Sequence, residues 1–125
     1  MPISQKRSKK KVSGGKYHKI PKRVNQLAGA PALTKVGERR AKLKREIGGN
    51  KKTTLLQNNI INVLDPKTKK YQKTEILSVV ENPANRNFVR RNIMTKGCIV
   101  ETKIGKAKLT SRPGQEGTVN GILVK

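Results

Sequence analysis

The chain has few of the residues on which catalysis and metal binding depend. It contains one cysteine, Cys98, one histidine, His18, and only seven Asp or Glu residues. A lone cysteine cannot form an internal disulfide, and a single histidine provides no metal-ligand spacing. Cys98 begins an apolar run, where we expect its thiol to be buried and to pack as a small hydrophobe. We therefore predict no catalytic residue, no metal and no cofactor, so the protein is not expected to be an enzyme.

Long apolar runs are also missing. No stretch approaches the ~18 consecutive apolar residues of a membrane span, and the basic start is not followed by the ~7–15 apolar residues of a signal peptide. The glycine pairs Gly14-Gly15 and Gly48-Gly49 lack the strand, helix and lysine context of a nucleotide-binding loop. We predict a soluble cytosolic protein with no membrane partner and no small-molecule substrate.

Aromatic residues are scarce, since only Tyr17, Tyr71 and Phe88 are present and tryptophan is absent. Single-stranded nucleic acids are usually held by bases that stack on aromatic side chains. A nucleic acid bound by this chain should therefore be recognised through its phosphates and its shape. Structured RNA offers pockets of dense phosphate that a basic segment can bridge.

Basic residues dominate the first 52 positions. They include seventeen Lys or Arg against Glu38 and Glu46, a net charge of +15 (17 − 2) out of +23 for the whole chain. Self-repulsion at this density opposes a compact state, whereas phosphates neutralise it and release condensed counterions. Nucleic acid is therefore the predicted partner. A solvated tail without a function is the alternative.

We predict two parts in the chain. Residues 1–47 are expected to form an extended basic tail that penetrates RNA and is disordered until bound, because residues 2–34 show no sustained apolar period. Most apolar residues follow residue 52, so residues 48–125 are predicted to form one small folded domain. Residues 35–47 fit a helix or a strand, and we predict an extended strand that ends at Gly48-Gly49.

Turn signals divide the second part into short strands. One strand is predicted over 71–80, with Thr74, Ile76, Ser78 and Val80 on one face. Gly105 should supply the positive φ of a hairpin turn, and Gly114 that of a second turn after Pro113. The other segments are an apolar run over 54–64, a loop over 81–87, a short extended segment over 88–91, and strands over 98–103, 107–111 and 118–124. We predict an all-β fold, a small closed or partly open barrel of about six short antiparallel strands with a long basic N-terminal extension.

The candidate RNA-binding residues are all basic. Arginines around the loop over 81–87 can bind phosphates in a bidentate manner. The alternative is that they form a solvated basic edge that discourages aggregation of the sheet. In an extended segment, Arg90 and Arg91 would point to opposite faces, so only one would contact RNA from a given face. Gly48-Gly49 can let the backbone approach a phosphate beside Lys51 and Lys52, or can serve as a flexible joint. The candidate rRNA-binding residues are Lys6, Arg7, Lys9, Lys10, Lys11, Lys16, Lys19, Lys22, Arg23, Arg39, Arg40, Lys42, Lys44, Arg45, Lys51, Lys52, Arg86, Arg90, Arg91, Lys96 and Arg112.

Several segments in order resemble the S8e family of small-subunit ribosomal proteins, which archaea and eukaryotes share. The residues 48–51, Gly-Gly-Asn-Lys, look like the family's glycine-glycine-asparagine signature, and residues 9–16 are similar to its basic beginning. The other matching segments are residues 62–68, 76–86, 88–97 and 110–117. The short length, without the large insertion of eukaryotic members, looks archaeal.

The resemblance implies a β-barrel domain with a basic extension, bound to small-subunit ribosomal RNA beside other small-subunit ribosomal proteins. It implies a structural role in subunit assembly and translation, in the cytoplasmic ribosome, and we expect no homo-oligomer. Composition alone leaves two alternatives. One is an architectural DNA-binding basic protein, and the other is an enzyme that acts on RNA.

Overall fold

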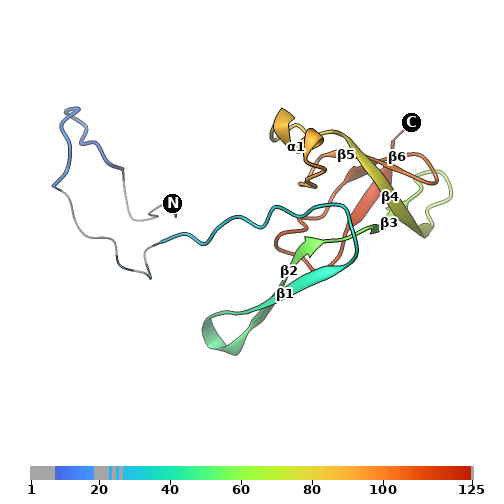
Figure 1. Cartoon of the computed structure of the whole chain (residues 1–125), viewed down its shortest axis with the longest axis horizontal. Coiled ribbons are helices and arrows are strands. Elements are labelled where there is room, and N and C mark those ends of the chain that lie inside the picture. Colours follow the sequence, from blue (N-terminus) through green and yellow to red (C-terminus); the bar gives the residue numbers. More distant parts are fainter. Residues whose placement is uncertain (1–7, 19–22, 24, 26, 125) are drawn as a thin grey trace. The chain divides into compact units, whose positions relative to one another are not determined.

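The structure is a computed structural model that describes residues 8–18, 23, 25 and 27–124 (Figure 1). The chain divides into two compact units, Met1–Pro31 and Ala32–Lys125. In the first unit, Lys10 and Lys16 form an antiparallel bridge, and the Lys11 N–H donates to the Gly15 carbonyl at 2.7 Å. The strands β1 to β7 and the helix α1 lie in the second unit. Within the described residues, no helix is long and apolar enough to cross a membrane.

The second unit is built around a closed barrel in which five strands follow one another in chain order. Neighbouring strands pair antiparallel, but β3 and β7 pair parallel and close the barrel. An up-and-down meander with an odd number of strands must close with a parallel pair, since its first and last strands run the same way. The predicted all-β barrel is confirmed, with five strands rather than about six. The barrel strands are β3 (Ile60–Leu64), β4 (Tyr71–Glu81), β5 (Ile99–Thr102), β6 (Lys106–Leu109) and β7 (Asn120–Leu123).

Side chains alternate between the core and the outer face along these strands, as the pleat requires. Ile61 and Val63 of β3 are buried, as are Ala107 and Leu109 of β6. The alternation predicted for residues 74–80 is wrong beyond Ile76. The register of β4 against β5 shifts between Ile76 and Ser78, and a bulge of this kind turns the following residues to the other face. Val79 is therefore buried, whereas Val80 is 42% exposed.

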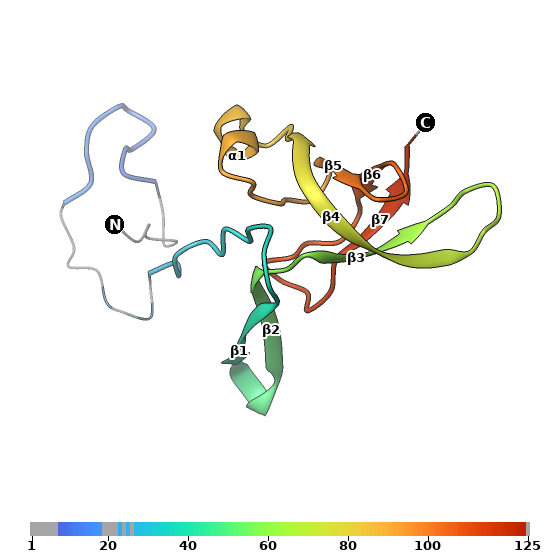
Figure 2. The ribbon, with the colours of Figure 1, turned by 45° about the vertical axis from the view of Figure 1, so that its right-hand side comes forward.

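The run predicted over 54–64 is divided by Asn58 and Asn59 into two strands. β2 (Lys51–Gln57) lies outside the barrel and pairs antiparallel with β1 (Arg40–Arg45). The strand predicted within residues 35–47 is confirmed over the six residues of β1. Figures 1 and 2 show that the β1–β2 hairpin projects away from the barrel.

A short helix, α1 (Arg86–Arg90), replaces the extended segment predicted over 88–91. Asn85 is its N-cap, and the Asn85 side-chain oxygen accepts from the Asn87 N–H at 2.9 Å, which satisfies one of the free donors of the first turn. Arg91 is the C-cap of the helix. The expectation that Arg90 and Arg91 point to opposite faces of a strand is therefore wrong.

The turn at Pro113-Gly114 is present, but its predicted backbone conformation is wrong. Gly105 has a φ of 149°, as expected, whereas Gly114 has no positive φ. The Gln115 N–H donates to the Arg112 carbonyl at 2.9 Å and closes the turn. A Cβ at Gly114 would lie 3.3 Å from the Ala32 carbonyl oxygen. Close approach of two backbone segments, rather than torsional freedom, explains the glycine at this position.

Candidate nucleic-acid interface

The most basic feature of the second unit is the hairpin arm, which we define as residues 39–52. All six residues of β1 are exposed. The one acidic residue of the arm, Glu46, lies 3.8 Å from the Lys52 ammonium. The cations of the arm are Arg39, Arg40, Lys42, Lys44, Arg45, Lys51 and Lys52, so its net charge is +6 (7 − 1).

The register of the hairpin places like charges opposite one another near its tip. Lys44 lies opposite Lys52, and Arg45 lies opposite Lys51. Because successive residues of a strand point to opposite faces, one pair lies on each face of the hairpin. Like charges in directly opposed positions destabilise a two-stranded sheet. Glu46 reaches only one of the four cations, so the arm can be stabilised further by an external anion on either face.

The tip of the arm is a tight turn formed by the 3₁₀ segment η2 (Ile47–Gly49). Gly48 and Gly49 have φ values of 73° and 77°, which favour glycine. The Glu46 N–H donates to the Asn50 carbonyl at 2.7 Å, and a Cβ at Gly49 would meet no atom within 4 Å. The glycine pair thus forms a hydrogen-bonded hairpin tip with an open approach to its backbone.

A second basic group surrounds α1. Arg86 and Arg90 are four residues apart, which places both guanidinium groups on one face of the helix, and Arg91 and Lys96 are also exposed. The buried side chain of Asn82 holds this segment. Its amide donates to the Ile93 carbonyl at 3.1 Å, and its oxygen accepts from the backbone of Ala84 at 3.0 Å and the hydroxyl of Thr95 at 2.9 Å. The hydrogen bonds of Asn82 therefore fix the segment that carries the four cations.

The structure separates the two groups in space. Both views place α1 and the tip of the hairpin arm at opposite ends of the second unit (Figures 1 and 2). Arg112 belongs with the base of the arm, because the carbonyl of the next residue, Pro113, accepts from the Leu55 N–H of β2 at 3.0 Å. A partner that touches both groups must therefore extend along the length of the unit.

The remaining candidates lie in the first unit. Lys9, Lys10, Lys11 and Lys16 are exposed on the turn over residues 8–17, and Arg23 is also exposed. The Lys11 ammonium lies 5.8 Å from the centre of the Tyr17 ring. Four candidates lie outside the described residues, namely Lys6, Arg7, Lys19 and Lys22. That these side chains contact RNA stays a prediction.

Three cations on the outer face of the barrel were not among the candidates, Lys73 of β4 and Lys106 and Lys108 of β6. Lys73 lies opposite Asn62, and Lys108 lies opposite Ile122. The outward direction of Lys73 follows from the alternation in the strand predicted over 71–80. The parallel pair of β3 and β7 lies between the strands that carry Lys73 and Lys108, and the sequence carries no local signal for that pair.

Two titratable groups in this unit have perturbed pKa values. Cys98 is buried in the hydrophobic core, which confirms its predicted packing role. This burial raises the pKa of the thiol and disfavours a thiolate nucleophile. Hydrogen bonds from the Lys67 N–H and the Thr68 hydroxyl lower the pKa of the Asp65 carboxyl. Among the described residues, no three His, Cys, Asp or Glu side chains form a group that could hold a metal ion.

Comparisons with known proteins identify the family. The model of the family described as Ribosomal protein S8e matches residues 4–124. A small ribosomal subunit protein eS8 from Methanobrevibacter smithii is 50% identical over 125 residues, which cover 99% of this chain and 100% of the relative. The proteins of the same name from Methanococcus aeolicus and Nanoarchaeum equitans are 47% and 49% identical, over 99% and 83% of this chain and 98% and 82% of their own lengths. The resemblance inferred from the sequence is confirmed, and the chain belongs to the ribosomal protein S8e family.

Proposed function

We propose that the chain is a structural constituent of the small ribosomal subunit, where it binds ribosomal RNA through phosphate contacts and supports subunit assembly and translation. The hairpin arm is the observation that carries this proposal. Two opposed pairs of like charges at an exposed tip are stabilised when phosphates lie against them. The names of the curated relatives support the same assignment.

The two basic groups of the second unit suggest how the RNA is held. The arm is narrow and charged on both faces, so it fits between two RNA strands and neutralises phosphates on each side. The α1 group carries arginines, which bind phosphate oxygens in a bidentate manner. Together with the basic first unit, these surfaces would connect RNA segments that lie apart.

The proposal includes other small-subunit ribosomal proteins as neighbours and the ribosome as the site of action. Membership in a family of ribosomal proteins supports a structural rather than catalytic role at the level of the family. The division of the chain at residue 47 into an RNA-penetrating tail and a domain stays a prediction. The second compact unit of the structure begins at Ala32.

Deleting residues 1–31 tests the contribution of the first unit. This deletion removes nine Lys or Arg and leaves the compact unit Ala32–Lys125. Each lost phosphate contact lowers the salt slope of binding by about 0.7–0.9, so we expect the slope to fall by up to about 6–8. Filter binding to small-subunit rRNA over a range of salt concentrations measures the slope. An unchanged slope would rule out this segment as a main anchor.

A further inference from the structure

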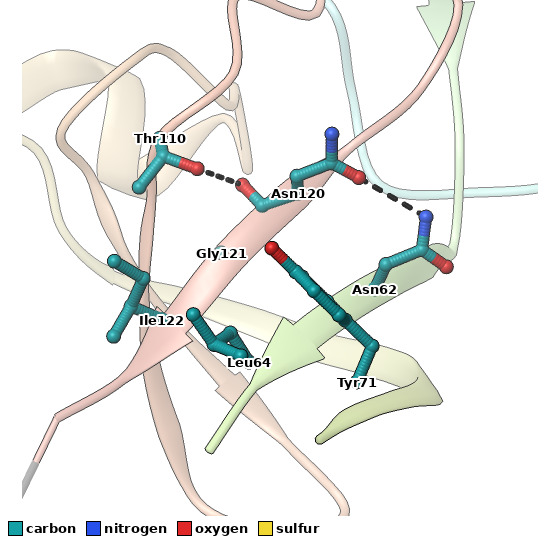
Figure 3. A pocket seen from close by; sticks show the side chains of 7 residues that line it. All are labelled: Asn62, Leu64, Tyr71, Thr110, Asn120, Gly121 and Ile122. Atoms are coloured by element: carbon teal, nitrogen blue, oxygen red, sulfur yellow. Dashed lines mark hydrogen bonds between the residues drawn. The ribbon is translucent and has the colours of Figure 1, made fainter. Parts of the chain in front are cut away.

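A hollow of about 530 Å³ lies on the outer face of the barrel. It is formed where β3 pairs with β7 and with the start of β4. Figure 3 shows that Tyr71, Leu64 and Ile122 line one part of it, and Asn62 and Asn120 another. The site therefore combines an apolar surface with two side-chain amides.

The apolar part is a row of side chains on three adjacent strands. Tyr71 of β4 lies opposite Leu64 of β3, and Leu64 lies beside Ile122 of β7. Tyr71 is 70% exposed, and Ile122 is 39% exposed. An exposed tyrosine ring beside two aliphatic side chains is a surface on which a flat apolar group can stack.

The amide part has hydrogen-bonding capacity that the protein does not use. The Asn62 amide donates to the Asn120 side-chain oxygen at 3.0 Å. Among the described residues, the Asn62 oxygen and the Asn120 amide make no further hydrogen bond. If both amides are turned over, the pair still presents one acceptor and one donor. The edges of nucleobases carry the donors and acceptors that can pair with such free groups.

Two lysines flank the hollow. Lys73 lies opposite Asn62 at one side, and Lys108 lies opposite Ile122 at the other. Both are exposed, and neither forms an ion pair within the described residues. Cations at both sides of an apolar and amide surface suit the phosphates that precede and follow a single nucleotide.

We propose that this hollow binds one unstacked base of ribosomal RNA, which deepens the proposed function and rests on it. Tyr71 stacks on the base, Asn62 and Asn120 hydrogen-bond to its edge, and Lys73 and Lys108 neutralise the flanking phosphates. RNA proteins commonly read splayed-out bases of loops and bulges by stacking and edge contacts of this kind. The paired amides and the two cations favour a nucleotide over an apolar side chain of a neighbouring protein.

Chemical footprinting of small-subunit rRNA with the full-length protein tests this inference. The wild-type protein is expected to protect the edge of one unpaired base, and Tyr71→Ala is expected to lose that protection. Loss of one stacked base should also weaken binding by about 5- to 150-fold. The phosphate protections made elsewhere should remain.

Two further variants make the result specific. Leu77→Ala removes another exposed apolar side chain from β4 and should leave the base protected. Asn120→Asp keeps the oxygen that accepts from Asn62 but replaces the free donor by a negative charge, so protection of the base should be lost. A footprint that Tyr71→Ala does not alter overturns the base site and leaves the proposed function intact. Absence of any footprint from the wild-type protein overturns the proposed function.

Discussion

Replacing Gly121 by valine is expected to unfold the barrel at temperatures where the wild-type protein is stable. Gly121 is buried in β7, and a Cβ there would lie 3.0 Å from both the Ile61 Cδ1 and the Lys108 carbonyl oxygen. The Ile61 side chain can rotate, but the Lys108 carbonyl belongs to the paired strand β6 and cannot move without opening the barrel. Overpacking costs typically about 1–3 kcal/mol, and we expect about 3 kcal/mol for the branched valine.

Thermal denaturation followed by circular dichroism measures this effect. For a domain of this size, about 3 kcal/mol corresponds to a fall in Tm of roughly 12–24 °C. Gly29→Ala is the control, because a Cβ at Gly29 meets no atom within 4 Å. Gly121→Ala should fall between the two. A Gly121→Val protein with the Tm of the control would show that β7 is not packed as described.

Neutralising four cations of the hairpin arm is expected to weaken RNA binding strongly. The variant carries Lys42→Gln, Lys44→Gln, Arg45→Gln and Lys51→Gln. Loss of four phosphate contacts lowers the salt slope by about 2.8–3.6 and, at 0.1 M salt, weakens binding by about 10³-fold. Filter binding to small-subunit rRNA at several salt concentrations measures both quantities.

The same variant is expected to be at least as stable as the wild-type protein in the absence of RNA. It removes both opposed like-charge pairs, each of which costs about 0.2–1 kcal/mol. Urea denaturation should therefore give an equal or higher free energy of unfolding. The matched control neutralises four other exposed lysines, Lys67, Lys69, Lys70 and Lys106, and should bind more tightly than the arm variant. Equal binding by the two variants would mean that net charge, rather than the arm, determines the affinity.

Much of the barrel can be predicted from local patterns in the sequence. Gly105 is a local turn signal, so the hairpin turn and the strands on its two sides, predicted over 98–103 and 107–111, are confirmed by β5 and β6. The burial of Cys98 follows in the same way from its apolar neighbours. The strand within residues 35–47 was harder, because its residues fit two periodicities and its strand partner lies beyond the glycine pair.

Other features depend on contacts between distant parts of the chain. The bulge in β4 comes from its register against β5, and Gly114 is required by the approach of Ala32. The helix α1 was missed because its five residues carry no apolar period, although Asn85 is a cap signal. Asn62 and Asn120 are 58 positions apart and meet only because β3 and β7 pair. The hollow they line could not be found from the sequence.

Sedimentation of a lysate of the source cells tests the central claim most directly. The protein is expected to sediment with the small ribosomal subunit and to remain there after the two subunits are separated, because its charges are neutralised by rRNA. An architectural DNA-binding protein of the same charge would sediment with chromosomal DNA and be released by DNase. Steady association with small subunits that DNase does not alter is the predicted result. Release by DNase and absence from the small-subunit fraction would contradict the account.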